Sequence, residues 1–181
     1  MYDQPSPQQI EASKQKLALQ LFQNPKLNTY AVLDGAANPG LLDHLYSKLP
    51  EFACLYRGEL EPDEAECAPY LVKLEANTPF ANWLIDNYWG SNWGIFALSD
   101  CEIDILRRHL RQFNLVYDPV SNGPLLFRYY DPRVLRIYLP TCDPEQSVDF
   151  FGPVQVFLAE MDDGISLASF SPKKSTRVQI C

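Results

Sequence analysis

The chain has 181 residues and a formal net charge of −8, and its length predicts one domain with a hydrophobic core of its own. The acidic balance argues against broad binding to a nucleic-acid backbone, because such binding needs clustered lysine and arginine. No apolar run reaches the roughly 20 residues of a membrane-spanning helix, and no basic region followed by an apolar run opens the chain. We therefore expect a cytoplasmic protein with no export signal, no membrane insertion and no nucleic-acid partner.

The cysteines and histidines lack the spacing of a metal site. There are five cysteines and two histidines, and no two cysteines form a CxxC pair. The odd number of cysteines favours reduced thiols, and His44 and His109 lie on predicted helices, where we interpret them as structural. The GxSxG, GxGxxG and GxxxxGK[ST] motifs are also missing. The sequence thus predicts no metal, no cofactor and no catalytic residue.

Six segments have apolar residues at helical spacing, and five of them begin with the same pair of residue types. A Ser, Asn, Thr or Asp side chain can accept a hydrogen bond from a free N–H at a helix start, and the proline that follows has no N–H to leave unpaired. These starts are at Ser6, Asn38, Thr78, Asp131 and Asp143. The remaining helix is predicted after Ser99, which has the capping-box spacing with Glu102. We expect the six helices to end near residues 23, 49, 88, 115, 139 and 152.

Short apolar runs between the helices predict strands. These runs cover residues 30–33, 52–56, 70–74, 93–98, 125–129 and 154–158, residues 118–123 are expected to form a turn, and residues 165–170 are expected to pair back as a hairpin. Because strands and helices mostly alternate, we predict the α/β class, as a single layered domain with a mixed, mostly central β-sheet flanked by helices. We divide the chain into an N-terminal helical lead (1–28), an α/β domain (29–160) and a C-terminal hairpin and tail (161–181).

Residues 58–69 carry five acids within eight positions, with Pro62 among them. A run of like charges of this kind is typical of a solvated loop. An acidic surface that binds a basic partner is the alternative.

The densest polar and aromatic cluster is the predicted strand-to-helix corner at residues 128–133. Asp131 and Pro132 have the residue types of a helix start, and Arg128 and Arg133 could pair with Asp131 and with a second acid, Asp34. Asp34 and the following Gly35 end the first predicted strand and are interpreted as a turn. A small hydrolase that uses the acids near Asp34 and Asp131 is the alternative for this corner.

Six side chains are candidates for contact with a partner protein. Two tryptophans lie four residues apart across a glycine turn, and tryptophan often anchors interfaces; alternatively, both rings cap the core. Six arginines fall within a 30-residue window of an otherwise acidic chain, and structural pairing and partner binding explain them about equally. The candidates are Trp89, Trp93, Arg107, Arg111, Tyr130 and Arg133.

Six short motifs occur in an order that resembles a known family. They are Tyr30–Ala36 (YAVLDGA), Ala68–Leu74 (APYLVKL), Trp89–Phe96 (WGSNWGIF), Leu106–Arg111 (LRRHLR), Leu126–Leu135 (LFRYYDPRVL) and Phe151–Val154 (FGPV). Together they resemble, over residues 29–155, the type VI secretion system effector adaptors, chaperones built on the domain of unknown function numbered 4123. Asp34, Gly35, Arg128, Asp131 and Pro132 belong to this signature and are interpreted as structural.

The resemblance implies a binding function and no catalysis. Members of this family are cytoplasmic adaptors that bind a toxic effector protein, often through its N-terminal region, and load it onto the C-terminal region of the VgrG spike. We expect the same two partners here, with the adaptor as a monomer.

Many relatives continue into a longer, mostly helical lobe after the last motif. Here the residues after Val154 predict only a hairpin and a tail. This raises the alternative that one lobe serves both partners.

Overall fold

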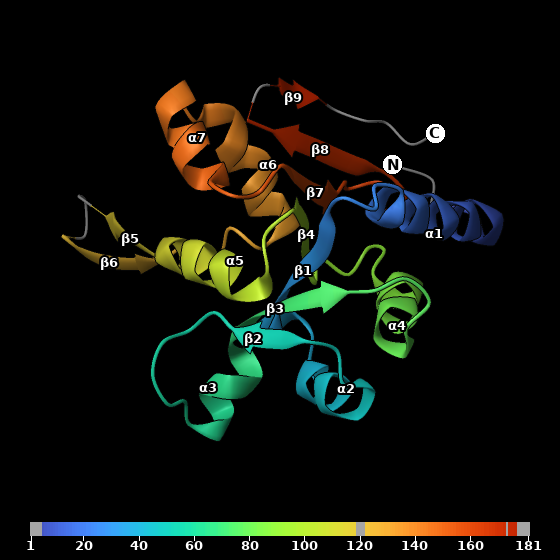
Figure 1. Ribbon diagram of the computed structural model, residues 1–181, viewed down its shortest axis with the longest axis horizontal. Helices are drawn as coiled ribbons and strands as arrows, with labels where there is room; N and C mark the ends of the chain where they lie inside the picture. The colour runs from blue at the N-terminus through green and yellow to red at the C-terminus, as the bar shows by residue number, and fades with distance from the viewer. Residues whose placement is uncertain (1–4, 119–121, 173, 177–181) are drawn as a thin grey trace.

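The computed structural model describes residues 5–118, 122–172 and 174–176, and in these residues a seven-stranded sheet passes between helices (Figure 1). Its strands lie in the order β2-β3-β1-β4-β7-β8-β9. Their bounds are β1 (Asn28–Asp34), β2 (Phe52–Cys54), β3 (Pro69–Leu74), β4 (Gly94–Ser99), β7 (Val156–Glu160), β8 (Leu167–Ser171) and β9 (Lys174–Thr176). A separate two-stranded ribbon consists of β5 (Leu115–Asp118) and β6 (Gly123–Leu126).

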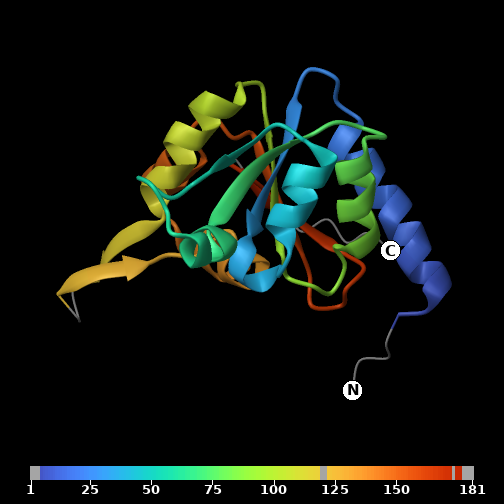
Figure 2. The ribbon, with the colours of Figure 1, turned by 90° about the horizontal axis from the view of Figure 1, so that it is seen from below.

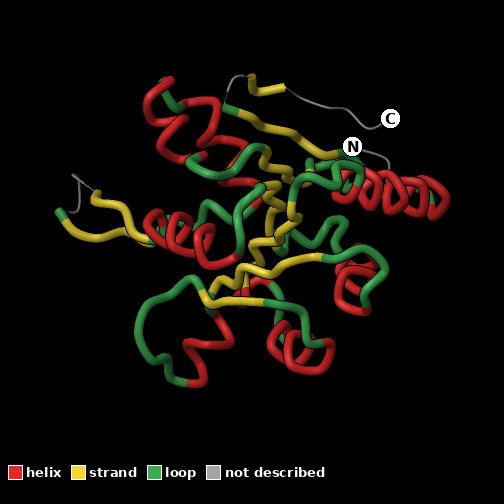
Figure 3. The backbone as a smooth tube through the Cα atoms, in the orientation of Figure 1, coloured by secondary structure: helices red, strands yellow, loops and turns green. Residues whose placement is uncertain are grey.

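The helices form a layer on each face of the sheet, which appears in Figure 3 as the yellow band between red coils. They are α1 (Pro7–Phe22), α2 (Leu41–Lys48), α3 (Pro62–Cys67), α4 (Pro79–Asn87), α5 (Ile103–Leu110), α6 (Pro132–Thr141) and α7 (Pro144–Phe151), with the short 3-10 turns η1 (Gly35–Ala37) and η2 (Arg111–Phe113). Helices α5, α6 and α7 lie on one side of the sheet in Figure 1, and α1, α2 and α4 lie on the other.

The central strand β1 is buried on both faces. Successive side chains of a strand point to opposite faces, and here Tyr30 and Val32 join the core under α5–α7, while Ala31 and Leu33 join the core under α1, α2 and α4. All four are fully buried. A strand that is covered on both faces needs an uninterrupted apolar run, which explains why residues 30–33 are so clear in the sequence.

The predicted α/β class, with a central sheet and flanking helices, is confirmed, but the sheet is not mixed. Every pairing between its described strands is antiparallel. The alternation of strands and helices does produce strands that run in the same direction. Strands β3 and β4 are joined through α4, but β1 lies between them and is antiparallel to both.

Four of the five expected helix starts have the predicted capping residue, namely Ser6, Thr78, Asp131 and Asp143, each of which accepts a backbone N–H bond from the first turn. The prediction of a helix start at Asn38 was wrong, because Asn38 follows the end of η1 and α2 begins after Gly40. Ser99 was also wrong: its hydroxyl donates to the Pro153 carbonyl at 2.8 Å, and α5 begins after Glu102 instead.

Two other expectations fail locally. The acidic segment contains the short helix α3 where a loop was expected, because Pro62 occupies the first turn and the Glu61 N–H donates to Glu64 Oε2 at 3.1 Å. The strand expected at 125–129 ends at Leu126, because the chain then turns so that Tyr129 enters the core. The expected hairpin after β7 is present as β8. Residues 119–121 of the expected turn, and residues 173 and 177–181 of the tail, lie outside the described residues.

Gly94 is where β4 comes closest to the central strand. A Cβ atom at this position would lie 2.1 Å from the carbonyl oxygen of Val32 in β1. We predict that Gly94→Ala lowers the free energy of unfolding by about 3 kcal/mol, the upper end of the usual cost of overpacking. Urea unfolding measures this cost.

The matched control is Gly58→Ala, where the added Cβ has no neighbour within 4 Å and only the positive φ of 86° is unfavourable. Its expected cost is about 1 kcal/mol. Equal costs for the two variants would contradict the close approach at Gly94.

Candidate functional site

The corner before α6 is held by a short ion pair within its first turn. Asp131 caps the helix by accepting the backbone N–H of Arg133 at 2.9 Å. Its carboxylate also accepts two bonds from the Arg133 side chain, from Nε at 2.9 Å and from Nη2 at 2.6 Å. Burial of Asp131 would raise its pKa, but the hydrogen bonds from Arg133 and the positive charge of that side chain hold the pKa below its ordinary value. Asp131 and Pro132 therefore set the backbone of the corner, as the sequence predicted.

A second ion pair joins this corner to the end of the central strand. The Arg128 guanidinium bonds to Asp34, which is 1% exposed. Asp34 also accepts the Ala36 N–H at 3.0 Å and so forms the turn that begins η1. Gly35 is required in this turn, because a Cβ atom there would lie 2.3 Å from the Glu66 carbonyl oxygen. The two ion pairs are the network expected from the sequence.

Both acids of the hydrolase alternative are thus occupied. Asp34 and Asp131 each hold a backbone N–H and an arginine. Neither lines either of the two pockets described for this structure. The corner provides rigid packing, with Tyr129 donating from its hydroxyl to the Leu110 carbonyl at 3.0 Å.

The turn between Trp89 and Trp93 is fixed by a buried acid that the sequence analysis missed. Glu160, at the end of β7, is 1% exposed and accepts the backbone N–H groups of Gly90 and Asn92. Burial raises its pKa to about 7, although both hydrogen bonds and Arg136 oppose this shift. No local pattern marks Glu160, because its partners are about 70 residues away in the chain.

Both tryptophans are half-buried and pack against the core. Trp93 stacks on Trp83 at a centroid distance of 5.5 Å, and Trp83 stacks in turn on His44 at 3.9 Å. Trp89 packs edge-on against Tyr88. The rings therefore cap the core beneath the turn, which was the structural alternative for this motif.

Arg107 and Arg111 hold the end of β2 against α5. Arg107 Nε donates to the Cys54 carbonyl at 3.0 Å, and Arg111 Nη2 donates to the Tyr56 carbonyl at 2.9 Å. Between them, the Asn114 side chain donates to the Leu55 carbonyl at 2.8 Å. The three successive carbonyls of residues 54–56, at the end of β2 and just after it, thus each receive a side-chain donor, which fixes this segment.

The structure therefore separates the six candidates for partner contact. Tyr130 is buried at 1% exposure, so its assignment to the surface is corrected. Arg133 is mainly exposed, with 57% of its side chain accessible. The other four are half-buried and have the structural contacts described above.

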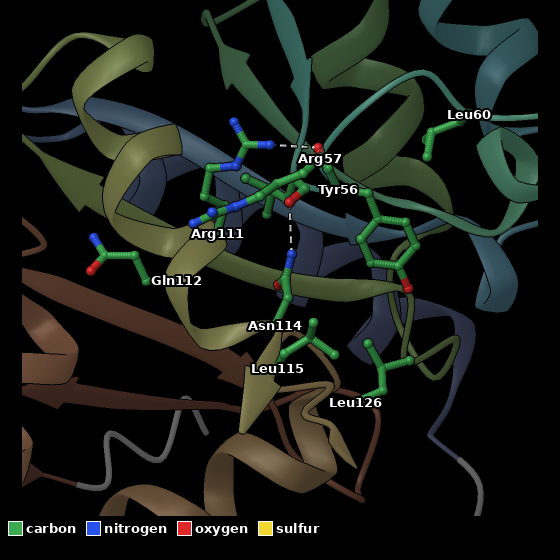
Figure 4. A pocket seen from close by; sticks show the side chains of 9 residues that line it. Tyr56, Arg57, Leu60, Arg111, Gln112, Asn114, Leu115 and Leu126 are labelled. Atoms are coloured by element: carbon green, nitrogen blue, oxygen red, sulfur yellow. Dashed lines mark hydrogen bonds between the residues drawn. The ribbon is translucent and has the colours of Figure 1, made fainter. Parts of the chain in front are cut away.

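A pocket of about 400 Å³ opens beside residues 54–56, whose carbonyls accept these side-chain hydrogen bonds. It has a polar and an apolar side (Figure 4). Arg57 and Arg111 extend toward the same side in this view, while the Tyr56 ring, Leu60 and Leu126 lie on the other. Arg111 is desolvated and close to Arg107 and Arg57, and these influences lower its pKa. Within the described residues no ion pair joins these three arginines to a carboxylate.

The pocket continues into the β5–β6 ribbon, which was not predicted as a pair of strands. Leu115 follows the helical spacing of α5, so the sequence analysis assigned it to the end of that helix. Residues 118–123 were expected to separate two segments as a turn. The apolar runs on each side of this turn were the pattern that could have predicted a hairpin.

In the described part of the chain, no group of three or more His, Cys, Asp or Glu side chains could hold a metal ion. Cys54, Cys67, Cys101 and Cys142 are free, and Cys181 lies outside the described residues. Among the described helices, none is both long enough and apolar enough to cross a membrane.

Fold and site together define a single-domain α/β protein with an antiparallel central sheet and two structural ion pairs in which buried carboxylates meet partly exposed arginines. The family model named Domain of unknown function (DUF4123) matches residues 29–148, which is 120 of the 181 residues. The chain belongs to this family. Comparisons with curated proteins and with solved structures gave no match.

The protonation of Glu160 should make stability depend on pH. Its pKa in the folded protein, about 7, is above the ordinary 4.5, so the folded state holds the proton more tightly than the unfolded chain. The stabilisation is present below pH 4.5 and is lost as the pH rises through 7, with an upper limit of about 3 kcal/mol at 1.36 kcal/mol per pKa unit.

We predict that Glu160→Gln removes this part of the pH dependence. Urea unfolding of both proteins at about pH 5 and about pH 8 gives the slope that is specific to Glu160, because other titrating groups contribute to both proteins. The variant also loses one bond to the turn, since its amide group cannot accept the second N–H. An identical pH slope in the two proteins would show that Glu160 is ionised throughout.

Proposed function

We propose that this chain is a cytoplasmic, non-catalytic adaptor that binds a type VI secretion effector and loads it onto the VgrG spike. Membership of the DUF4123 family and the ordered motifs that resemble effector adaptors support the proposal. The observation that carries it is the β5–β6 ribbon, where apolar side chains are exposed on a protruding element. An element of this kind is typical of a surface that binds another protein.

The polar signature is consistent with a binding protein. Its ion pairs are used within the fold, at the end of β1 and at the start of α6. An enzyme of the hydrolase alternative would need one of these acids within hydrogen-bond reach of a substrate. Both acids instead have internal partners, which favours the adaptor over the hydrolase.

The acidic segment at residues 58–67 is a weaker second surface. Helix α3 has no buried residue, so its acids can meet a basic partner at long range. Such an interaction would be strongly screened by salt, and this dependence distinguishes it from contact through the ribbon.

Co-purification tests the proposal directly. We expect the chain to form complexes with the effector and with the C-terminal region of the VgrG spike encoded near its own gene, when these proteins are mixed at micromolar concentration. Failure to bind either protein would contradict the proposal.

Arg133→Ala should weaken such a complex more than it lowers the melting temperature, because the Arg133 side chain is mainly exposed and Asp131 keeps its capping bond without it. The matched control is Arg108→Ala, an exposed arginine on α5. A loss of binding that only follows a loss of folding would assign Arg133 to the structure alone.

A further inference from the structure

The β5–β6 ribbon is apolar on both of its faces. Leu115 pairs with Leu126, and Val116 pairs with Leu125. Because neighbouring pairs point to opposite faces, each face carries one of these apolar pairs. The exposed fractions are 63% for Leu115, 36% for Val116, 65% for Tyr117, 53% for Leu125 and 44% for Leu126.

This exposure is unusual for a ribbon in water. An antiparallel sheet at the surface normally has one apolar face and one polar face. Full burial of a leucine or valine side chain is worth about 1.5–3 kcal/mol, so contact with a partner would provide a large driving force here. In Figures 1 and 2, which differ by 90°, the ribbon extends away from the rest of the protein.

The base of the ribbon is firmly attached, which pre-organises it for binding. The Phe127 N–H donates to the Asn114 carbonyl at 2.9 Å, and the Asn114 side chain holds the Leu55 carbonyl. In the described residues β5 and β6 pair only with each other. Each strand thus keeps one edge with unpaired backbone groups, to which an extended peptide can add.

The pocket gives this surface an electrostatic preference. Leu115 and Leu126, which share one face of the ribbon, also line the pocket. Arg57 and Arg111 line the same pocket, and their mutual repulsion has no carboxylate to offset it in the described contacts. A negative charge placed beside them would relieve this repulsion.

From these observations we propose that the pocket and the adjoining β5–β6 ribbon bind an extended peptide segment that carries an acidic side chain next to apolar ones. The carboxylate lies beside Arg57 and Arg111, and the apolar side chains pack on Tyr56, Leu115 and Leu126. The segment pairs with a free ribbon edge. The proposed adaptor function identifies the partner protein, but the chemistry of the segment is inferred from this surface alone.

A second copy of the chain fits the surface less well. Residues 115–117 and 123–126 of a second ribbon carry no acidic side chain that could lie beside Arg57 and Arg111. An acidic, apolar segment of a different protein supplies both the negative charge and the apolar contacts.

The test uses the whole protein and a displayed library of random short peptides. Selection on the immobilised chain should enrich sequences that combine an acid with apolar residues. We expect Leu115→Ser and Arg57→Gln each to weaken binding of a synthetic copy of an enriched peptide by about tenfold, as for an interface anchor. Both side chains are exposed, so the melting temperature should change little.

Ile137→Ser and Arg108→Gln are the matched controls. They remove an exposed apolar side chain and an exposed arginine outside the ribbon and the pocket, and binding should be unchanged.

Several results would overturn the proposal: no enrichment, enrichment of basic peptides, or equal losses in the controls. A wild-type dimer that Leu115→Ser dissociates would show that a second copy occupies the ribbon. Because the peptide selection uses neither the effector nor the spike, its result is independent of the co-purification result.

Discussion

Burial of the central strand on both faces is the constraint on which the rest of the structure depends. Strand β1 contributes side chains to both cores and pairs on either side with β3 and β4. Helices cover both faces of the sheet, so the strands themselves are open to other molecules only at the ends and edges of the sheet and in the projecting ribbon. At one end, the pair between Asp34 and Arg128 ties β1 to the corner that begins α6.

The most recognisable residues of the chain are therefore used within it. Asp34, Arg128, Asp131 and Arg133 form two ion pairs, and Glu160 holds the tryptophan turn. In both ion pairs the carboxylate is buried, whereas the arginine is partly or mainly exposed. The signature residues Asp34, Arg128 and Asp131 thus fix the shape of the domain, and the binding surface that we propose uses other residues. Asn114 attaches the base of the apolar ribbon and its pocket to the rest of the domain, because its side chain bonds to the loop after β2.

The sequence predicts those parts of the structure that depend on neighbouring residues. The caps at Thr78, Asp131 and Asp143 and the buried run at 30–33 follow from local residue types. The direction of strand pairing does not, because it depends on which strand inserts between β3 and β4.

The site shows the same division. Pairing of Arg128 and Arg133 with Asp34 and Asp131 was foreseen from charge, but Glu160 and the pocket were not. Glu160 binds its turn from about 70 residues away in the chain, and the pocket combines residues between 55 and 60 with residues between 111 and 115 and with Leu126. Leu115 illustrates the remaining difficulty: its spacing continues the pattern of α5, although α5 ends at Leu110 and β5 begins at Leu115.

The central claim is that the ribbon is the main contact for the partner, with the exposed Arg133 as a further contact. Backbone hydrogen exchange of the chain, alone and in complex with its effector, tests this claim most directly. Amides of β5 and β6 should exchange rapidly in the free protein and slow down by at least about tenfold in the complex, while those of β1 remain slow in both states. Unchanged exchange in the ribbon on formation of the complex, whatever protection arises elsewhere in the chain, would contradict the account.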